Sequence, residues 1–117
     1  MAKKKSVSSM KFDSIHELFS RADRWVKGSL AYTVADPEGS LAVSCKVTSP
    51  KAVCFCLLGG VKRVYAPGDR TPVQRRLRDV IKRLFPDRAY RGDIIDFNDH
   101  SDTDIKDIRK VVKLAYA

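Results

Sequence analysis

The stretch Val53-Cys-Phe-Cys-Leu-Leu-Gly-Gly60 places two cysteines one residue apart inside an apolar run that a glycine pair closes. Structural zinc sites take Cys-x2–4-Cys pairs completed by further Cys or His ligands, and this spacing does not fit that pattern. A thiolate nucleophile needs a base and an electropositive surrounding, and nothing in the sequence places a histidine beside Cys56. We therefore predict that Cys54 and Cys56 are small buried hydrophobic residues, with no metal site.

The flanking sequence predicts a buried helix that contains this stretch. Ser49-Pro50 is an N-cap residue followed by proline at the first helical position, and Ala66-Pro-Gly-Asp69 interrupts the pattern. Apolar residues cover most of the predicted helix surface, which indicates a central position in the fold. Gly59 and Gly60 are expected to permit close helix packing, since no Lys-Ser/Thr phosphate-binding signature accompanies them.

Three further helices are expected from caps and apolar periodicity. Ser14-Ile-His-Glu17 fits a capping box at the start of a helix over 14–27. Thr71-Pro72 opens an amphipathic helix over 72–85, and the last helix begins between residues 101 and 104. Residues 30–47 form either one short β-hairpin or an ordered loop around the Asp36-Pro-Glu-Gly39 turn. The predicted fold is mainly α: a compact bundle of about four helices, with that hairpin as its only β-structure.

The chain length and composition fit one domain. The 117 residues are 44% hydrophobic and 32% charged, as in globular proteins. We expect a disordered basic tail over residues 1–9 and a single globular helical domain over 10–117. The basic start lacks the apolar stretch of a signal peptide, and three cysteines do not make a disulfide framework. These features predict a cytoplasmic protein without a membrane segment.

The charge is uneven along the chain. The net charge is +9, and residues 62–91 carry ten Lys or Arg against three Asp, whereas residues 92–107 carry six Asp against one Lys. Such a basic segment favours an anionic partner, and Tyr65 and Tyr90 lie where they could stack on bases. A solvated polar face, partly neutralised by the acidic segment, explains the same residues. The candidate partner-binding residues are Lys62, Arg63, Arg70, Arg75, Arg76, Arg78, Lys82, Arg83 and Arg88.

The acidic segment resembles a calcium-binding loop only in part. A twelve-residue EF-hand loop that began at Asp96 would need glycine at position 101 and glutamate at position 107. The chain has Ser101 and Asp107 there instead. Asp and Asn in this segment are better explained as caps and turn residues at the positive end of the last helix. We therefore expect no bound metal and no cofactor.

Three short motifs are similar to those of a family of small bacterial and phage proteins known only as a domain of unknown function. They are W-x-x-G-S-L-A from Trp25, A-V-C-F-C-L-L-G-G from Ala52 and F-N-D from Phe97, and the resemblance covers about residues 13–116. It implies no activity. The matched positions are Trp25, Gly28, Phe55, Cys56, Gly59, Phe97, Asn98 and Asp99. Asn98 and Asp99 are either a shared site or, as we favour, a turn anchored by Phe97.

Together these patterns predict a small, basic, non-enzymatic binding module. Its helix over 72–85 is expected to contact nucleic acid or a nucleic-acid-associated protein, and the phage-type resemblance makes a regulator or modulator of a host factor reasonable. The alternative is a protein–protein inhibitor or adaptor of a host protein whose charges serve solubility and steering. An enzyme that uses Cys56 or the Asn98–Asp99 region comes third.

Overall fold

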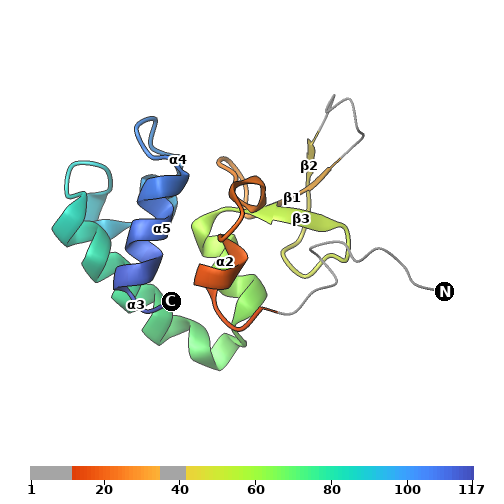
Figure 1. Ribbon diagram of the computed structural model, residues 1–117, viewed down its shortest axis with the longest axis horizontal. Coiled ribbons are helices and arrows are strands. Elements are labelled where there is room, and N and C mark those ends of the chain that lie inside the picture. Colours follow the sequence, from red (N-terminus) through yellow and green to blue (C-terminus); the bar gives the residue numbers. More distant parts are fainter. Residues whose placement is uncertain (1–11, 35–41) are drawn as a thin grey trace.

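The computed structural model describes residues 12–34 and 42–117. Helices α3, α4 and α5 lie together at one end of the molecule, and a small sheet lies at the other, with α1 and α2 between them (Figure 1). The predicted tail over 1–9 lies outside the described residues. The helices are α1 (Ile15–Leu18), α2 (Leu57–Val64), α3 (Pro67–Leu84), α4 (Ile94–Asp99) and α5 (Ile105–Leu114), joined by the 3₁₀ turns η2 (Ala22–Arg24) and η3 (Tyr90–Gly92). The strands are β1 (Ala31–Val34), β2 (Ala42–Ser44) and β3 (Ala52–Phe55).

The fold is mainly α with a short antiparallel sheet, as predicted. Strands β1 and β2 pair with Thr33 opposite Val43, so the hairpin alternative within residues 30–47 is confirmed. The predicted turn over 36–39 lies outside the described residues. The sheet has three strands in the order β2-β1-β3, and the third strand was not expected.

This third strand corrects the predicted helix that contained the cysteines. Residues Ala52–Phe55 pair with β1, and the helix begins only at Leu57. The Ser49 hydroxyl accepts a hydrogen bond from the Lys51 amide, so Ser49-Pro50 forms a turn before a strand instead of a helix cap. Val53 and Phe55 are residue types that favour strands, and pairing with β1 decides between the two structures. Cys54 therefore lies in β3, and Cys56 becomes the N-cap of α2.

The predicted first helix is also much shorter than expected. Its cap is confirmed, since the Ser14 hydroxyl accepts a hydrogen bond from the Glu17 amide at 3.1 Å. Helix α1 ends at Leu18, however, and Trp25 is extended and bridges to Phe55. The Arg109 guanidinium on α5 donates to the carbonyls of Phe19 and Ser20, both at 2.9 Å. Since these two carbonyls accept hydrogen bonds from α5, they do not need the amides of a further helical turn as partners.

The later helices follow the sequence more closely. Helix α3 begins at Pro67, five residues before the predicted start, and retains Pro72 within its second turn. Asp104 and Asp107 form the capping box of α5, so the helix begins at the end of the predicted range of residues 101–104. Helix α4 was not expected, and it is capped by Asp93, whose side chain accepts from the Asp96 amide at 2.9 Å.

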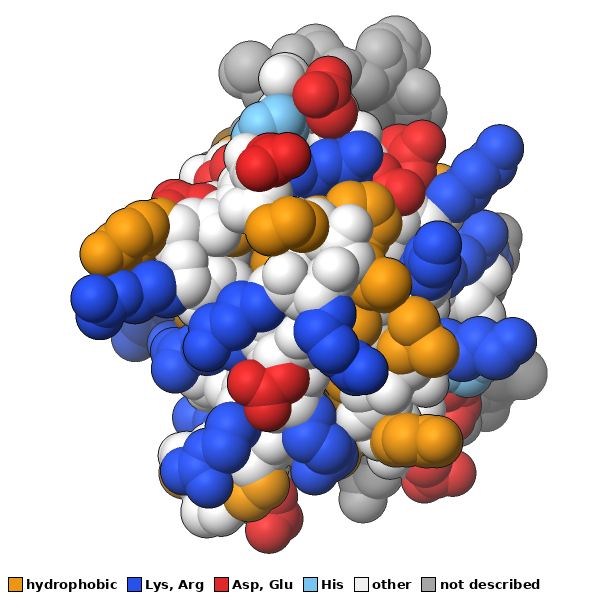
Figure 2. Space-filling model, turned by 90° about the vertical axis from the view of Figure 1, so that its left-hand side faces the viewer, with side chains coloured by type: hydrophobic (Ala, Val, Ile, Leu, Met, Phe, Trp, Pro, Cys, Tyr) orange, Lys and Arg blue, Asp and Glu red, His pale blue; other side chains and the backbone are white. Residues whose placement is uncertain are grey.

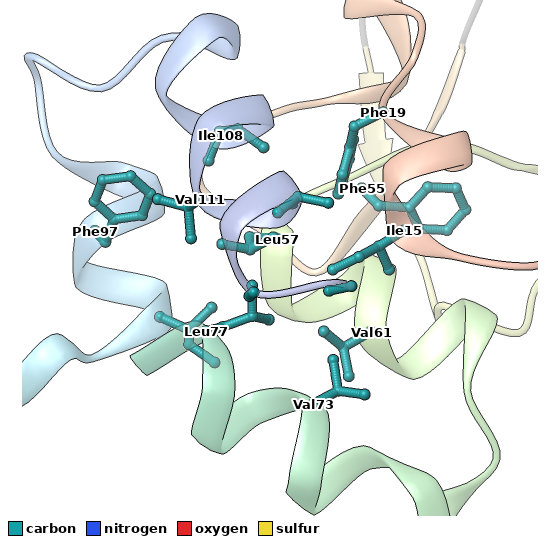
Figure 3. Close-up of a cluster of buried hydrophobic side chains, with 14 of the residues drawn as sticks. Ile15, Phe19, Phe55, Leu57, Val61, Val73, Leu77, Phe97, Ile108 and Val111 are labelled. Atoms are coloured by element: carbon teal, nitrogen blue, oxygen red, sulfur yellow. The ribbon is translucent and has the colours of Figure 1, made fainter. Parts of the chain in front are cut away.

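Side chains from the helices and from β3 share one core (Figure 3). Leu57 and Val61 of α2 lie at its centre, and the buried faces of α1, α3, α4 and α5 surround them. Gly59 permits this packing, because an added Cβ would lie 1.8 Å from the carbonyl oxygen of Leu30. The prediction of close packing at the glycine pair is thus confirmed, although the neighbour of Gly59 is the chain entering β1 and not a helix.

Among the described residues, no helix combines the length and the apolar character needed to cross a bilayer.

Candidate nucleic-acid interface and the hollow beside Cys56

Asn98 connects three separate segments in the interior. Its side chain is fully buried near the end of α4. The Oδ1 atom accepts hydrogen bonds from the Trp25 indole at 2.6 Å and from the Leu57 amide at 2.9 Å. Its Nδ2 group donates to the Val26 carbonyl at 3.1 Å. The Asn98 amide therefore holds the start of α2 and the segment before β1 against α4.

Asp99 extends this network toward the surface. Its Oδ1 atom accepts from the Gly28 amide at 3.0 Å and from Asn98 Nδ2 at 2.9 Å. Phe97 is buried and stacks on Phe85 with ring centroids 5.2 Å apart. Asn98 and Asp99 thus make tertiary contacts across more than seventy residues of sequence. We had expected them only to form a local turn, whereas they also connect α4 to distant segments.

The two cysteines differ in their surroundings. Cys56 is only 4% exposed, and its sulfur accepts a hydrogen bond from the Gly59 amide at 3.3 Å, whereas Cys54 is half-buried in β3. Burial raises the pKa of both thiols above the ordinary value, and for Cys56 this exceeds the opposing effect of the backbone amides at the start of α2. Both thiols are therefore protonated at neutral pH.

Cys56 does line a hollow of about 300 Å³ between α4 and the segment before β1. The other residues lining this hollow are Gly28, Ser29, Leu30, Ile95 and Asp99. Among the residues lining this hollow, Asp99 is the titratable neighbour of the thiol, and its carboxylate opposes ionisation of the sulfur. Neither histidine lines the hollow. Within residues 12–34 and 42–117, no group of three or more His, Cys, Asp or Glu side chains is placed to hold a metal ion. This arrangement lacks the base and the electropositive setting that an activated thiolate requires.

Four of the nine predicted basic residues are engaged inside the protein. Arg63 donates to the Val47 carbonyl at 2.6 Å, and Arg70 donates to the carbonyls of Lys62 and Tyr65 at 2.9 Å each. Arg76 donates to the Ala115 carbonyl at 2.8 Å. Arg88 forms an ion pair with Asp107 at 2.6 Å. These arginines fix helix ends and loops, so they are weaker candidates for contacts to a partner than the sequence suggested.

The remaining candidates form what we call the α3 face: Arg75, Arg78, Lys82 and Arg83. All four are exposed, and within the described part of the chain none has a hydrogen-bond or ion-pair partner. Arg75, Arg78 and Lys82 follow one stripe of the helix at the spacing of three and four residues, with Asp79 beside them. Figure 2 shows the side of the molecule on which α3 ends, where Lys and Arg side chains gather around a single acidic group. Lys62, the ninth candidate, lies half-buried on α2.

The two tyrosines predicted to stack on bases differ in their exposure. The Tyr65 hydroxyl donates to the Ala117 carbonyl at 2.8 Å and is half-buried. Tyr90 is 74% exposed in η3, with the Arg91 guanidinium 5.1 Å from its ring centroid. Of these two tyrosines, Tyr90 is the one whose ring is open to a partner.

Sequence reasoning missed a broad hollow next to this tyrosine. The hollow measures about 580 Å³ and lies between the loop that follows α3 and the end of α4. The proline and glycine that bound residues 86–92 indicate a loop, but the sequence does not show that this loop faces α4. The residues lining the hollow are Pro86, Asp87, Arg88, Ala89, Tyr90, Asp96, Asp99 and His100.

Comparison with known protein families gives one match. The model of a family described as a "Family of unknown function (DUF6197)" matches residues 11–117. The chain belongs to the DUF6197 family. This confirms the resemblance to a domain of unknown function that the Trp25, Cys56 and Asn98 motifs suggested. Searches of the curated proteins and of the solved structures give no significant match.

Proposed function

We propose that this DUF6197 protein is a small, non-enzymatic binding module that contacts nucleic acid through the α3 face. One observation carries the proposal: four exposed cations on one helix have no partner within residues 12–34 and 42–117, whereas neighbouring arginines are engaged. Cations that neutralise phosphates release condensed counterions, which supplies most of the affinity of sequence-independent binding. In this proposal the protein acts as a regulator in a bacterial or phage setting, without catalysis of its own.

The chemistry of the α3 face suits phosphate oxygens. Guanidinium groups of Arg75, Arg78 and Arg83 can each present two parallel donors to a phosphate, and Lys82 adds a point charge. The proline at residue 67 and the long run of α3 keep this stripe on a rigid element. Asp79 reduces the local positive charge, which favours a moderate affinity for nucleic acid that added salt weakens.

The proposal is tested by fluorescence anisotropy with labelled DNA and RNA oligonucleotides of mixed sequence. Affinity should fall steeply with added salt, because several phosphates are neutralised on binding. The double variant Arg75→Glu/Arg78→Glu should lose binding by about a hundredfold or more at low salt, since two attractive contacts become repulsive.

A matched control keeps the overall charge equal. Lys46→Glu/Lys51→Glu changes the net charge by the same amount, but these exposed lysines lie in the connection between β2 and β3, at the sheet end of the molecule (Figure 1). This variant should retain most of the affinity. Equal losses in both variants would show that only overall charge matters, and absence of binding by the wild-type protein at low salt would exclude the proposal.

A further inference from the structure

The loop after α3 places an exposed aromatic ring beside the α3 face. Gly92 seats this loop, because an added Cβ would lie 2.5 Å from the Arg78 carbonyl oxygen and 3.0 Å from Lys82 Cγ. Its φ of +71° and that of Arg91 at +53° turn the chain sharply there. As a result, Tyr90 and Arg91 lie next to the part of α3 that carries Arg78 and Lys82.

The 580 Å³ hollow adjoins this ring and differs from the α3 face in charge. Tyr90 forms part of its wall, and the carboxylates of Asp96 and Asp99 and the ring of His100 form another part. Arg88, the only Lys or Arg in the lining, is already paired with Asp107. The hollow therefore offers hydrogen-bond acceptors and aromatic surface, while the cations lie outside it on α3.

We propose that the α3 face and the Tyr90 hollow together bind an unpaired nucleotide of a single-stranded nucleic acid. The inference deepens the proposed function and rests on it. Phosphates contact Arg78, Lys82 and Arg83, and the attached base stacks on Tyr90 at the mouth of the hollow. Duplex DNA keeps its bases stacked inside, so it cannot use the ring.

The charges also select among bases. Asp96 is exposed, and within the described residues its carboxylate has no hydrogen-bond or ion-pair partner. The carboxylate can therefore accept hydrogen bonds from base amino groups. Cytosine, adenine and guanine carry such amino groups, whereas thymine and uracil do not. A strand rich in cytosine should therefore bind more tightly than one rich in thymine, while phosphates are repelled from the hollow toward α3.

The first experiment compares one labelled strand, alone and annealed to its complement, at equal low salt. The single strand should bind at least about fivefold more tightly, as expected when a base stacks on one aromatic side chain. Tyr90→Ala should remove this advantage and leave the affinity for the duplex unchanged, whereas Tyr90→Phe should retain it. Because Tyr90 is largely exposed, neither variant should alter the thermal unfolding temperature.

The second experiment measures oligo-dC against oligo-dT, with the matching RNA strands as a separate arm. Asp96→Asn should reduce the preference for dC, since a neutral amide that can also donate replaces an acceptor-only carboxylate. The inference would be overturned if the wild-type protein bound single strand and duplex equally, or if Tyr90→Ala still preferred the single strand. Binding of duplex by the α3 face would leave the proposed function standing. If the wild-type protein binds neither form, both the inference and the proposed function fail.

Discussion

Polar groups are paired in the network around Asn98 and unpaired on the α3 face, as far as the described residues show. Around Asn98, each amide atom of the buried side chain is paired, and no buried side-chain nitrogen or oxygen among the described residues lacks a partner. On the α3 face, four charged groups have no partner within the described residues. A paired interior network stabilises the fold, whereas unpaired surface charge adds little to stability and remains available for binding.

The same contrast separates two adjacent arginines. Arg75 extends into solvent from α3, whereas Arg76 donates to the Ala115 carbonyl at the end of α5. They are the same residue type one position apart, and the rotation of the helix leaves one without a partner in the described residues and gives the other an acceptor on α5. The predictions below test this separation between paired and unpaired positions, beginning with the largest effect.

Gly59→Ala should break the paired interior most severely. The new Cβ would lie 1.8 Å from the Leu30 carbonyl oxygen, and that backbone also accepts a hydrogen bond from the Cys56 amide. Since backbone must move, the loss in unfolding free energy should be about 4 kcal/mol, above the usual range for overpacking. Urea denaturation followed by circular dichroism measures it.

Gly68 provides the matched control on α3. Apart from its chain neighbours and its own helix backbone, no atom of the described residues lies within 4 Å of an added Cβ there. Gly68→Ala should therefore leave stability unchanged or raise it by up to about 0.5 kcal/mol through helix propensity. A destabilisation of similar size in both variants would contradict the close approach at Gly59.

Asn98→Ala should have the next largest effect. It removes the partners of the buried Leu57 amide and of the half-buried Trp25 indole and Val26 carbonyl, which would then lack these hydrogen bonds. The expected cost is about 3 kcal/mol, with a change in tryptophan fluorescence because Trp25 is the only tryptophan. Asp102→Ala, at an exposed position nearby, should change stability by less than about 0.5 kcal/mol.

The arginine pair gives a smaller and more discriminating test. Arg76→Ala should lower the unfolding free energy by about 1 kcal/mol, because a charged hydrogen bond to the Ala115 carbonyl is lost. Arg75→Ala should not change stability measurably, yet it should weaken nucleic-acid binding. The reverse result, with Arg75 stabilising and Arg76 binding, would refute the division between the two positions.

The thiols give the smallest effect on stability, and it appears only at high pH. Burial raises the pKa of Cys56, so the unfolded state loses its thiol proton at lower pH than the folded state. Stability from this group is complete below the unfolded pKa of about 8.5 and is lost as the pH rises above it. Cys56→Ala should show a shallower decline of unfolding free energy between neutral and alkaline pH than the wild-type protein.

Alkylation measures the same group directly. In a variant with Cys45 and Cys54 replaced by serine, Cys56 should react slowly with iodoacetamide when folded and rapidly in urea. Rapid labelling of the folded protein would revive a catalytic role for the 300 Å³ hollow.

The sequence by itself determined the amphipathic helices, their caps and the basic surface. The apolar spacing along α3 and α5, the Ser14 cap and the Asp104–Asp107 capping box depend on neighbours within a turn or two, so local chemistry specifies them. The resemblance to a family of unknown function likewise followed from short motifs, and the match over residues 11–117 confirms membership of such a family.

Only the tertiary structure decided the rest. Residues 52–55 became a strand because β1 lies beside them, and the first helix stops where Arg109 of α5 satisfies the carbonyls of Phe19 and Ser20 that follow it. Likewise, four of the nine candidate cations found internal acceptors, and the four on the α3 face did not find one among the described residues. These outcomes depend on groups brought together from distant parts of the chain, and hydrogen bonding between such groups leaves no periodic trace in the sequence.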